Sequence, residues 1–493
     1  MRTVLLAGVL ASMFATPALA DWRKAETQHL VVYGDGFERD LRDYAVRLER
    51  FDHLLRTQLS VPNTPGEMKL PVYLVSSRRE LEQVNGGLPT NAAGFYSANF
   101  RDVRAVAIAG EWDAALFHEY AHHFMLRNAP GWYPSWLVEG FADFFMTASL
   151  DERGQAEIGK PERARIMALH NVRWLPMERV LSPWSPSNIG PDDRHAAYGQ
   201  AWLFTHWLIT SPERFGRLNG YLRDTSAGMN VAEAVQANFG MSTDQLERAL
   251  KTYLNAGIRH AEITIPGVAP DVTVSSLPDS ADDALLLYVN LRDGAPRAEG
   301  ATLLTRARAL SARRPNDPFT RLTLARAEIL FGDPSAGEAA LTPDLEANPN
   351  DVERLLLISD ARITAGEKFE DPAERERLYR QARGFLQRAY AADPNDHRVY
   401  QTIAHSRRFS PDYPTENDVE LWRRAVAIAP QIASNRPVAA EALLKHGRYE
   451  EADAIIRPLA SNPHGVETPD RLQRILDDIA AQRNAASTAP PTS

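Results

Sequence analysis

The sequence predicts a chain of two parts, an α+β domain with a small mixed sheet followed by an all-α helical solenoid. Strand-like and helix-like patterns mix from Asp21 to about Ala261, whereas the pattern is helical from about residue 284 onward. Between the two parts, Pro and Gly indicate a connector with room for two short strands. A length of 493 residues, 44% of them apolar, suits two or three globular domains. The predicted segments are 1–20, 21–261, 262–283, 284–485 and a disordered tail at 486–493.

The first 20 residues have the pattern of a cleavable secretory signal peptide. Arg2 precedes an apolar stretch at residues 4–15, and small residues at Ala18 and Ala20 fit cleavage after Ala20. The alternative, a retained membrane anchor, is disfavoured because the apolar stretch is too short to cross a bilayer. We therefore expect a periplasmic or secreted protein without a stable membrane anchor.

The chain has no cysteine and a formal net charge of -9. Outside the cytoplasm, a lack of cysteine excludes disulfides and thiolate metal ligands. Any bound metal would therefore be held by His and carboxylate side chains. The negative charge gives no indication of nucleic-acid binding.

Apolar periodicity predicts the elements of the first part. Strands are predicted at 29–33, 71–75, 94–97 and 103–109, and helices at 41–59, 78–84, 163–170, 196–208, 212–222, 231–239 and 243–254. The last five of these helices are expected to form a lower lobe that closes a cleft.

Two histidines four residues apart organise the first part. In Phe117-His-Glu-Tyr-Ala-His-His-Phe124, His118 and His122 would project from one face of a helix, near enough to bind a single metal ion. Glu119 is offset by about a third of a turn, which places its carboxylate beside the open coordination position. There it can take a proton from a bound water. The pattern predicts one zinc ion per chain.

A second helix carries two carboxylates within an apolar sequence. Glu139 and Asp143 lie four residues apart in Trp136-Leu-Val-Glu-Gly-Phe-Ala-Asp-Phe-Phe145. Burying an unpaired carboxylate costs several kcal/mol, so both side chains need cations or donors. Zinc for Glu139 and a ligand imidazole for Asp143 would supply them. The alternative is that the carboxylates face solvent or pair with an arginine such as Arg127.

Together, His118-Glu-Tyr-Ala-His122 and Glu139-Gly-Phe-Ala-Asp143 resemble the gluzincin clan of zinc metallopeptidases, over roughly residues 90–150. The resemblance implies a thermolysin-like metallopeptidase domain, with His118, His122 and Glu139 as zinc ligands and Glu119 as general base. It also implies a hydrogen bond between the outer ring nitrogen of His118 and Asp143. The connection of 16 residues between His122 and Glu139 is short, and is more similar to compact peptidase MA-like members.

The same resemblance implies two further features. A Tyr or His from the second lobe donates to the oxyanion in gluzincins; Tyr198 is the first candidate and His195 the second, and the alternative is a core tyrosine. A sheet edge binds the extended substrate; residues 94–96 are candidates, and the alternative is a buried hairpin. His123 and His206 are predicted to be structural.

The second part contains a repeat. Pro-Asn-Asp recurs at Pro315, Pro349 and Pro394. The first interval is 34 residues, the tetratricopeptide (TPR) length, and the succession of helix, Gly turn, helix and Pro is similar to that of TPR proteins. We attribute the second interval of 45 residues to an acidic insertion at about 366–376. The alternative is a generic helical bundle.

The leading functional hypothesis is a zinc peptidase whose TPR-like part is a separable module that docks a protein partner or substrate. Metal-activated water would cleave the peptide bond with Glu119 as general base. The alternative is a TPR scaffold with a vestigial or structural zinc site. Glu119 argues against this alternative, because a structural site has no need of a base.

Overall fold

The computed structural model describes residues 22–64, 68–88, 92–110, 113–129, 131, 133–184, 189–461 and 469–488. The predicted signal peptide and residues 489–493 of the predicted tail lie outside these ranges. Helix α21 (Pro469–Thr488) continues to Thr488, so the prediction of disorder is wrong for residues 486–488. Residues 486–488 continue a helix that begins at Pro469, and extending an existing helix costs less than starting one.

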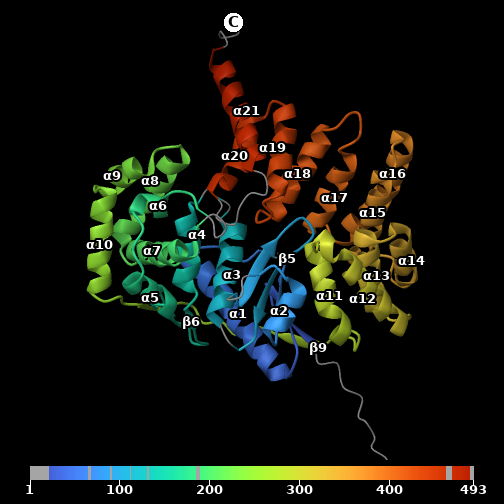
Figure 1. Cartoon of the computed structure of the whole chain (residues 1–493), viewed down its shortest axis with the longest axis horizontal. Coiled ribbons are helices and arrows are strands. Elements are labelled where there is room, and N and C mark those ends of the chain that lie inside the picture. Colours follow the sequence, from blue (N-terminus) through green and yellow to red (C-terminus); the bar gives the residue numbers. More distant parts are fainter. Residues whose placement is uncertain are drawn as a thin grey trace, which may run out of the picture.

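A six-stranded mixed sheet forms the centre of the first part (Figure 1). In spatial order its strands are β4 (Gly94–Ala98), β5 (Val103–Ile108), β3 (Leu70–Val75), β2 (Leu30–Gly34), β1 (Arg23–Glu26) and β9 (Thr273–Ser276). Strands β2, β3 and β5 are parallel, whereas β1, β4 and β9 are antiparallel to their neighbours. A second, antiparallel sheet contains β6 (Ser149–Leu150), β7 (Gln155–Ile158) and β8 (Ala261–Thr264). The four strands predicted from apolar patterns are all present.

Helices cover this sheet and form a lobe beside it (Figure 1). They are α1 (Glu38–Leu59), α2 (Arg78–Val84), α3 (Asp113–Asn128), α4 (Ser135–Phe145), α5 (Arg163–Asn171), α6 (Met177–Leu181), α7 (Pro191–Ile209), α8 (Pro212–Ser226), α9 (Val231–Phe239) and α10 (Thr243–Asn255). Apolar side chains of α1 and α3 share one core with the strands. Every helix predicted in this part is present, and the short α6 is additional.

Helix α4 approaches α7 closely at Gly140. A Cβ atom at Gly140 would lie 2.2 Å from Oγ1 of Thr205 and 2.6 Å from the carbonyl oxygen of Ala201. Only glycine lets the two helices come this near. The contact fixes the position of the preceding residue, Glu139, whose side chain is wholly buried.

The second part is an array of helices that curves around one side of the sheet (Figure 1). Its helices are α11 (Ala281–Asp293), α12 (Gly300–Arg313), α13 (Pro318–Phe331), α14 (Pro334–Ala347), α15 (Val352–Glu367), α16 (Pro372–Ala392), α17 (His397–Arg407), α18 (Glu416–Ile428), α19 (Asn435–Lys445), α20 (Tyr449–Ile456) and α21, with 3-10 turns at Arg297–Glu299 and Arg457–Ser461.

The recurring Pro-Asn-Asp marks the start of every second helix from α13 to α17. Its aspartates are N-caps: Asp317 accepts from the backbone N–H of Thr320, Asp351 from that of Arg354, and Asp396 from that of Arg398. The longer second interval comes mostly from α16, which has 21 residues where α14 has 14. The predicted insertion is therefore largely added helix.

The array shares a core with the sheet. Trp22, Tyr73 of β3 and Val106 of β5 pack together with Leu285 and Val289 of α11. Helix α11 thus covers the sheet face opposite α1 and α3. Strand β9, within the predicted connector, is also hydrogen-bonded to the sheet through β1. The expectation of a separable module is therefore not supported, because strand β9 of the connector extends the sheet and helix α11 of the array covers one of its faces.

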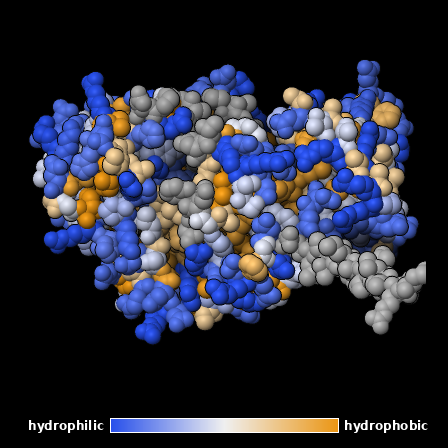
Figure 2. All heavy atoms as spheres, turned by 60° about the horizontal axis from the view of Figure 1, so that its bottom comes forward, coloured by the Kyte–Doolittle hydropathy of each residue, from blue (hydrophilic) through white to orange (hydrophobic). Residues whose placement is uncertain are grey.

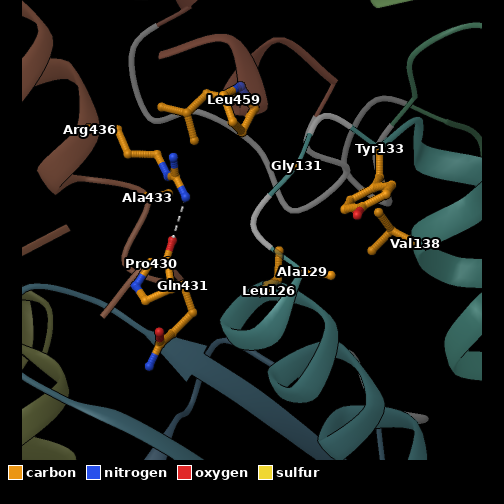
Figure 3. Close-up of a pocket in the computed structure, with 11 residues that line it drawn as sticks. Leu126, Ala129, Gly131, Tyr133, Val138, Pro430, Gln431, Ala433, Arg436 and Leu459 are labelled. Atoms are coloured by element: carbon orange, nitrogen blue, oxygen red, sulfur yellow. Dashed lines mark hydrogen bonds between the residues drawn. The ribbon is translucent and has the colours of Figure 1, made fainter. Parts of the chain in front are cut away.

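The turn between α3 and α4 also faces the array (Figure 3). Leu126 of α3 and Val138 of α4 lie across a small cavity of about 30 Å³ from Arg436 of α19. Arg436 is buried and donates to the carbonyl oxygen of Pro430 at 3.0 Å. Arg127 of α3 donates at 3.0 Å to the carbonyl at the end of α18. The array thereby holds the C-terminal end of α3.

On the face drawn in Figure 2, hydrophilic residues cover most of the surface and hydrophobic residues gather in small separate areas. Among the described residues, no helix combines the length and the apolar character needed to cross a membrane.

The shared core generates a prediction about truncation. A fragment of residues 21–266 should be strongly destabilised, because it loses β9 and α11 and exposes side chains such as Trp22 and Tyr73, each worth about 1.5–3 kcal/mol when buried. Thermal unfolding followed by circular dichroism, compared with the full chain, measures the loss. Adding the complementary fragment 267–493 should restore part of it. An isolated fragment that melts within a few degrees of the full chain would contradict the prediction.

Candidate metal centre

Helices α3 and α4 bring two imidazoles and one carboxylate together. Nε2 of His118 lies 3.0 Å from Nε2 of His122, and Oε2 of Glu139 lies 3.4 Å and 3.5 Å from these nitrogens. Glu139 is wholly buried and the His122 side chain nearly so, whereas 13% of the His118 side chain is exposed. The three atoms form a triangle that is open to solvent only near His118.

The triangle fits a tetrahedral metal ion. Zinc binds imidazole nitrogen and carboxylate oxygen at about 2.0–2.2 Å, which places neighbouring tetrahedral ligands about 3.3–3.5 Å apart. The observed sides of 3.0 to 3.5 Å are close to this spacing. Three protein ligands leave a fourth position for water or substrate, as in catalytic zinc sites. These residues would therefore hold one zinc ion.

The electrostatics of the site also favour a cation. Burial alone would lower the pKa of His118, but hydrogen bonds with Asp143 and Glu139 and the charges of Asp143 and Glu119 outweigh burial and raise this pKa to about 10. Three carboxylates thus act on one imidazole. A divalent cation at the triangle would be stabilised by the same charges.

Asp143 is held between His118 and an arginine that the sequence analysis did not consider. Its Oδ1 lies 3.0 Å from Nδ1 of His118, and Arg165 of α5 donates to both carboxylate oxygens, at 2.6 and 2.9 Å. Burial raises the pKa of Asp143, but the charge of Arg165 and the hydrogen bond with His118 lower it by more. The net effect is a pKa below the ordinary value, so the carboxylate stays ionised. Asp143 is wholly buried, so the alternative of solvent exposure is wrong for it. The alternative of pairing with an arginine is confirmed for Asp143, with Arg165 as the partner in place of Arg127.

Glu119 and Tyr198 both lie next to the triangle. Glu119, half-buried on α3, is close enough for its charge to raise the pKa of both His118 and Tyr198. Tyr198 of α7 packs under the guanidinium of Arg165, 4.8 Å from its ring centre. Burial, together with the charges of Glu139 and Asp143, raises the pKa of Tyr198 well above its ordinary value. Its hydroxyl therefore remains a donor at neutral pH.

The other predicted residues occupy different places. His195, one turn before Tyr198, is exposed on α7. Residues 94–96 belong to β4, which is an edge strand of the six-stranded sheet and packs beside α3. In β4, the Tyr96 hydroxyl lies 3.1 Å from Nδ1 of His123. Burial and the charges of Arg127 and Arg56 lower the pKa of His123 to about 3, so it is a neutral core residue.

His206 is also a core residue. Its Nε2 donates to the carbonyl oxygen of Gly159 at 3.1 Å, and its Nδ1 accepts from the hydroxyl of Tyr253 at 2.9 Å. Burial lowers the pKa of His206 to about 4. The prediction that His206 is structural agrees with these contacts.

A second cluster of His and acidic side chains anchors helix α3. His29 Nδ1 lies 2.6 Å from Glu49 and 3.0 Å from Asp52, which also accepts from Arg56 at 2.6 Å and from the Tyr120 hydroxyl at 2.7 Å. The members bond one another, so the cluster is a hydrogen-bonded network. Through Tyr120, the neighbour of Glu119, it ties α3 to α1.

Comparisons with known proteins cover two parts of the chain. A family described as "Protein of unknown function (DUF1570)" matches residues 114–231, which include every candidate residue of the metal centre from His118 to Tyr198. No curated protein matches the chain.

The solved structures that the chain resembles include a thermophilic TPR protein of Thermus thermophilus, 18% identical, with a TM-score of 0.34 over 41% of this chain and 99% of that one. MamA from Desulfovibrio magneticus RS-1 is 15% identical, with a TM-score of 0.27 over 41% of this chain and 97% of that one. Likenesses at this level say nothing of function. None of these comparisons names a peptidase, so the peptidase hypothesis depends on the geometry of the metal centre.

The contacts of Asp143 predict its effect on metal binding. Asp143→Asn should keep the fold but weaken zinc affinity by about 10- to 100-fold, because the amide no longer orients and polarises His118 as a carboxylate does. Competition with a chromophoric chelator measures the affinity. Glu213→Gln, a like change on the exposed part of α8, should leave affinity unchanged. Equal affinities for Asp143→Asn and the wild type would contradict the assignment.

The burial of His206 predicts a pH dependence. Its folded pKa of about 4 is below the ordinary value of 6.5, so the unfolded state binds the proton more tightly. Its stabilising contribution is complete above pH 6.5 and falls as the pH drops towards 4, by about 2 kcal/mol between pH 7 and pH 5. Urea unfolding at both pH values should show a smaller loss for His206→Gln, which cannot be protonated. Identical losses in both proteins would show that another group controls the acid sensitivity.

Proposed function

We propose that the protein is a periplasmic or secreted zinc-dependent peptidase. One observation carries the proposal: two imidazoles and a carboxylate converge with the spacing of zinc ligands, and Glu119 lies beside them without being one of them. A metal site with three protein ligands and an adjacent carboxylate base has the composition that hydrolysis requires. A structural site would have no use for Glu119.

The chain's own residues can divide the work of peptide hydrolysis. When bound, zinc would supply Lewis acidity and a nucleophilic water at neutral pH. Glu119 would take the proton of the attacking water and pass it to the leaving amine. Tyr198, protonated at neutral pH, would donate to the oxygen on which negative charge develops. Asp143 would hold His118 in the correct orientation, and Arg165 would hold Asp143.

Strand β4 offers a place for the substrate. It is the edge strand nearest α3, so its outer backbone groups can pair with an extended peptide. A peptide bound there would run past the face of α3 that carries Glu119. This arrangement favours an unstructured segment of a protein as the substrate over a folded one.

A protein-binding scaffold is the second candidate function. The paired helices of the array favour it, because stacked helix pairs present an extended surface that suits protein partners. In this case the metal centre would be structural or vestigial, and Glu119 would have no effect on any activity.

Substitution of Glu119 distinguishes the two candidates. Glu119→Gln should retain one zinc per chain but reduce hydrolysis of a random peptide library by at least about 100-fold, because the amide cannot accept the proton. Elemental analysis measures the metal, and mass spectrometry of the library measures cleavage. His122→Ala, the matched control, should lose both metal and activity. A zinc-loaded wild type that cleaves nothing, or a Glu119→Gln variant with unimpaired turnover, would contradict the proposed mechanism.

A further inference from the structure

The turn between β4 and β5 enters the concave side of the helical array. Phe100 in this turn packs against the array core, and its carbonyl oxygen accepts a hydrogen bond from Gln401 of α17. Its ring contacts that of His405 edge-on, with centroids 6.0 Å apart. The array therefore contacts and holds in place the turn that joins the edge strand β4 to β5.

A cavity of about 380 Å³ remains beside this turn. It lies between Phe100 and the inner helices α13, α15 and α17, and its walls include Ile329, Leu357 and Ile363. The volume is within the range of known ligand sites. These walls would accept apolar side chains.

Asp360 of α15 lines the same cavity. Over the described ranges, no hydrogen bond or ion pair within 4.0 Å reaches its carboxylate, which keeps part of its surface open to the cavity. Burial raises the pKa of Asp360, although the charges of Arg101 and Arg326 partly oppose this. A carboxylate enclosed in this way is costly unless a cation pairs with it.

The basic groups around Asp360 are engaged elsewhere or exposed. Arg326 donates to Glu353 at 2.5 Å and lies over the ring of Tyr288. Arg101 is exposed to solvent. Burial, with the charges of Arg408 and Arg101, lowers the pKa of His405 to about 4, so this residue is neutral. Beside its apolar walls, the cavity is thus lined by two arginines and two carboxylates, and the second carboxylate, Glu367, pairs with Arg408 at 3.5 Å. Asp360 is the carboxylate of this lining that lacks a close partner among the described residues.

We propose that this cavity binds a protein segment in which a lysine or arginine is flanked by apolar residues. The cation would pair with Asp360, and its apolar neighbours would rest against Phe100 and the walls of α13 and α15. A protein segment suits the site because successive inner helices of an array form a continuous groove for extended chains. The inference does not depend on the proposed peptidase activity.

Peptide selection tests the proposal with the full mature chain carrying Glu119→Gln, which keeps bound peptides intact if the peptidase proposal is correct. Peptides selected from a random library should contain a lysine or arginine next to an apolar residue. Asp360→Asn should weaken the best of them by about tenfold or more, as for an enclosed charge pair. Glu346→Gln, the same charge change on the outer helix α14, should have no effect.

A change in the peptide checks that the two charges meet. Replacing the cation of the selected peptide by norleucine should weaken its binding to the chain that keeps Asp360 by about tenfold or more. The same replacement should cause little further loss in the Asp360→Asn variant, because the pair is already broken there. Equal losses in both proteins would show that the cation binds elsewhere, and would overturn the proposal.

Stability gives a further measurement that needs no ligand. Asp360→Asn should leave the melting temperature unchanged or raise it, because it removes an enclosed charge without an internal partner. A lower melting temperature would mean that Asp360 is paired inside the protein, and would overturn the proposal. Selected peptides that lack a cation, or a selection that yields no binders, would also overturn the proposal. So would spermidine that displaces the peptide as readily as an excess of the same unlabelled peptide does, because this would indicate a small polyamine ligand.

Discussion

The burial of two carboxylates on one apolar helix is the constraint around which the first part of the protein is arranged. Glu139 and Asp143 are both wholly buried on α4, so each requires positive charge or hydrogen-bond donors at close range. Asp143 obtains them from His118 and Arg165. Glu139 faces the two imidazoles, where a metal ion would complete its environment. The approach of α4 to α7 at Gly140 keeps both carboxylates away from solvent.

Much of this centre could be predicted from the sequence, because helical spacing alone fixes which side chains share a face. His118, His122, Glu139 and Asp143 meet as their four-residue intervals predict. Arg165 could not be predicted, because it comes from α5 and meets Asp143 only through the packing of α5 and α7. Nothing in its local sequence distinguishes it from other surface arginines.

In the fold, too, features set by local sequence could be predicted, whereas features set by contacts between distant segments could not. Apolar patterns predicted β2, β3, β4 and β5, whereas β1 has the polar sequence Arg23-Lys-Ala-Glu26 and gave no signal. The 34-residue interval predicted paired helices, and the structure explains it through N-cap aspartates such as Asp317. The contact of the array with the sheet depends on surfaces far apart in the chain. For that reason the boundary predicted from composition does not separate two cores.

Strand β9 and helix α11 have a consequence for the order in which the chain can fold. As the chain is made from its N-terminus, the sheet face that includes Tyr73 and Val106 is covered in part by the short α2 but lacks α11 until Asp293, the end of α11, has emerged. By then both helices of the metal centre have long been synthesised. A chain interrupted before that point carries every residue of the candidate metal centre but an incomplete core, and is exposed to proteolysis and aggregation. The fold thereby makes the completion of the first part depend on the array that follows it.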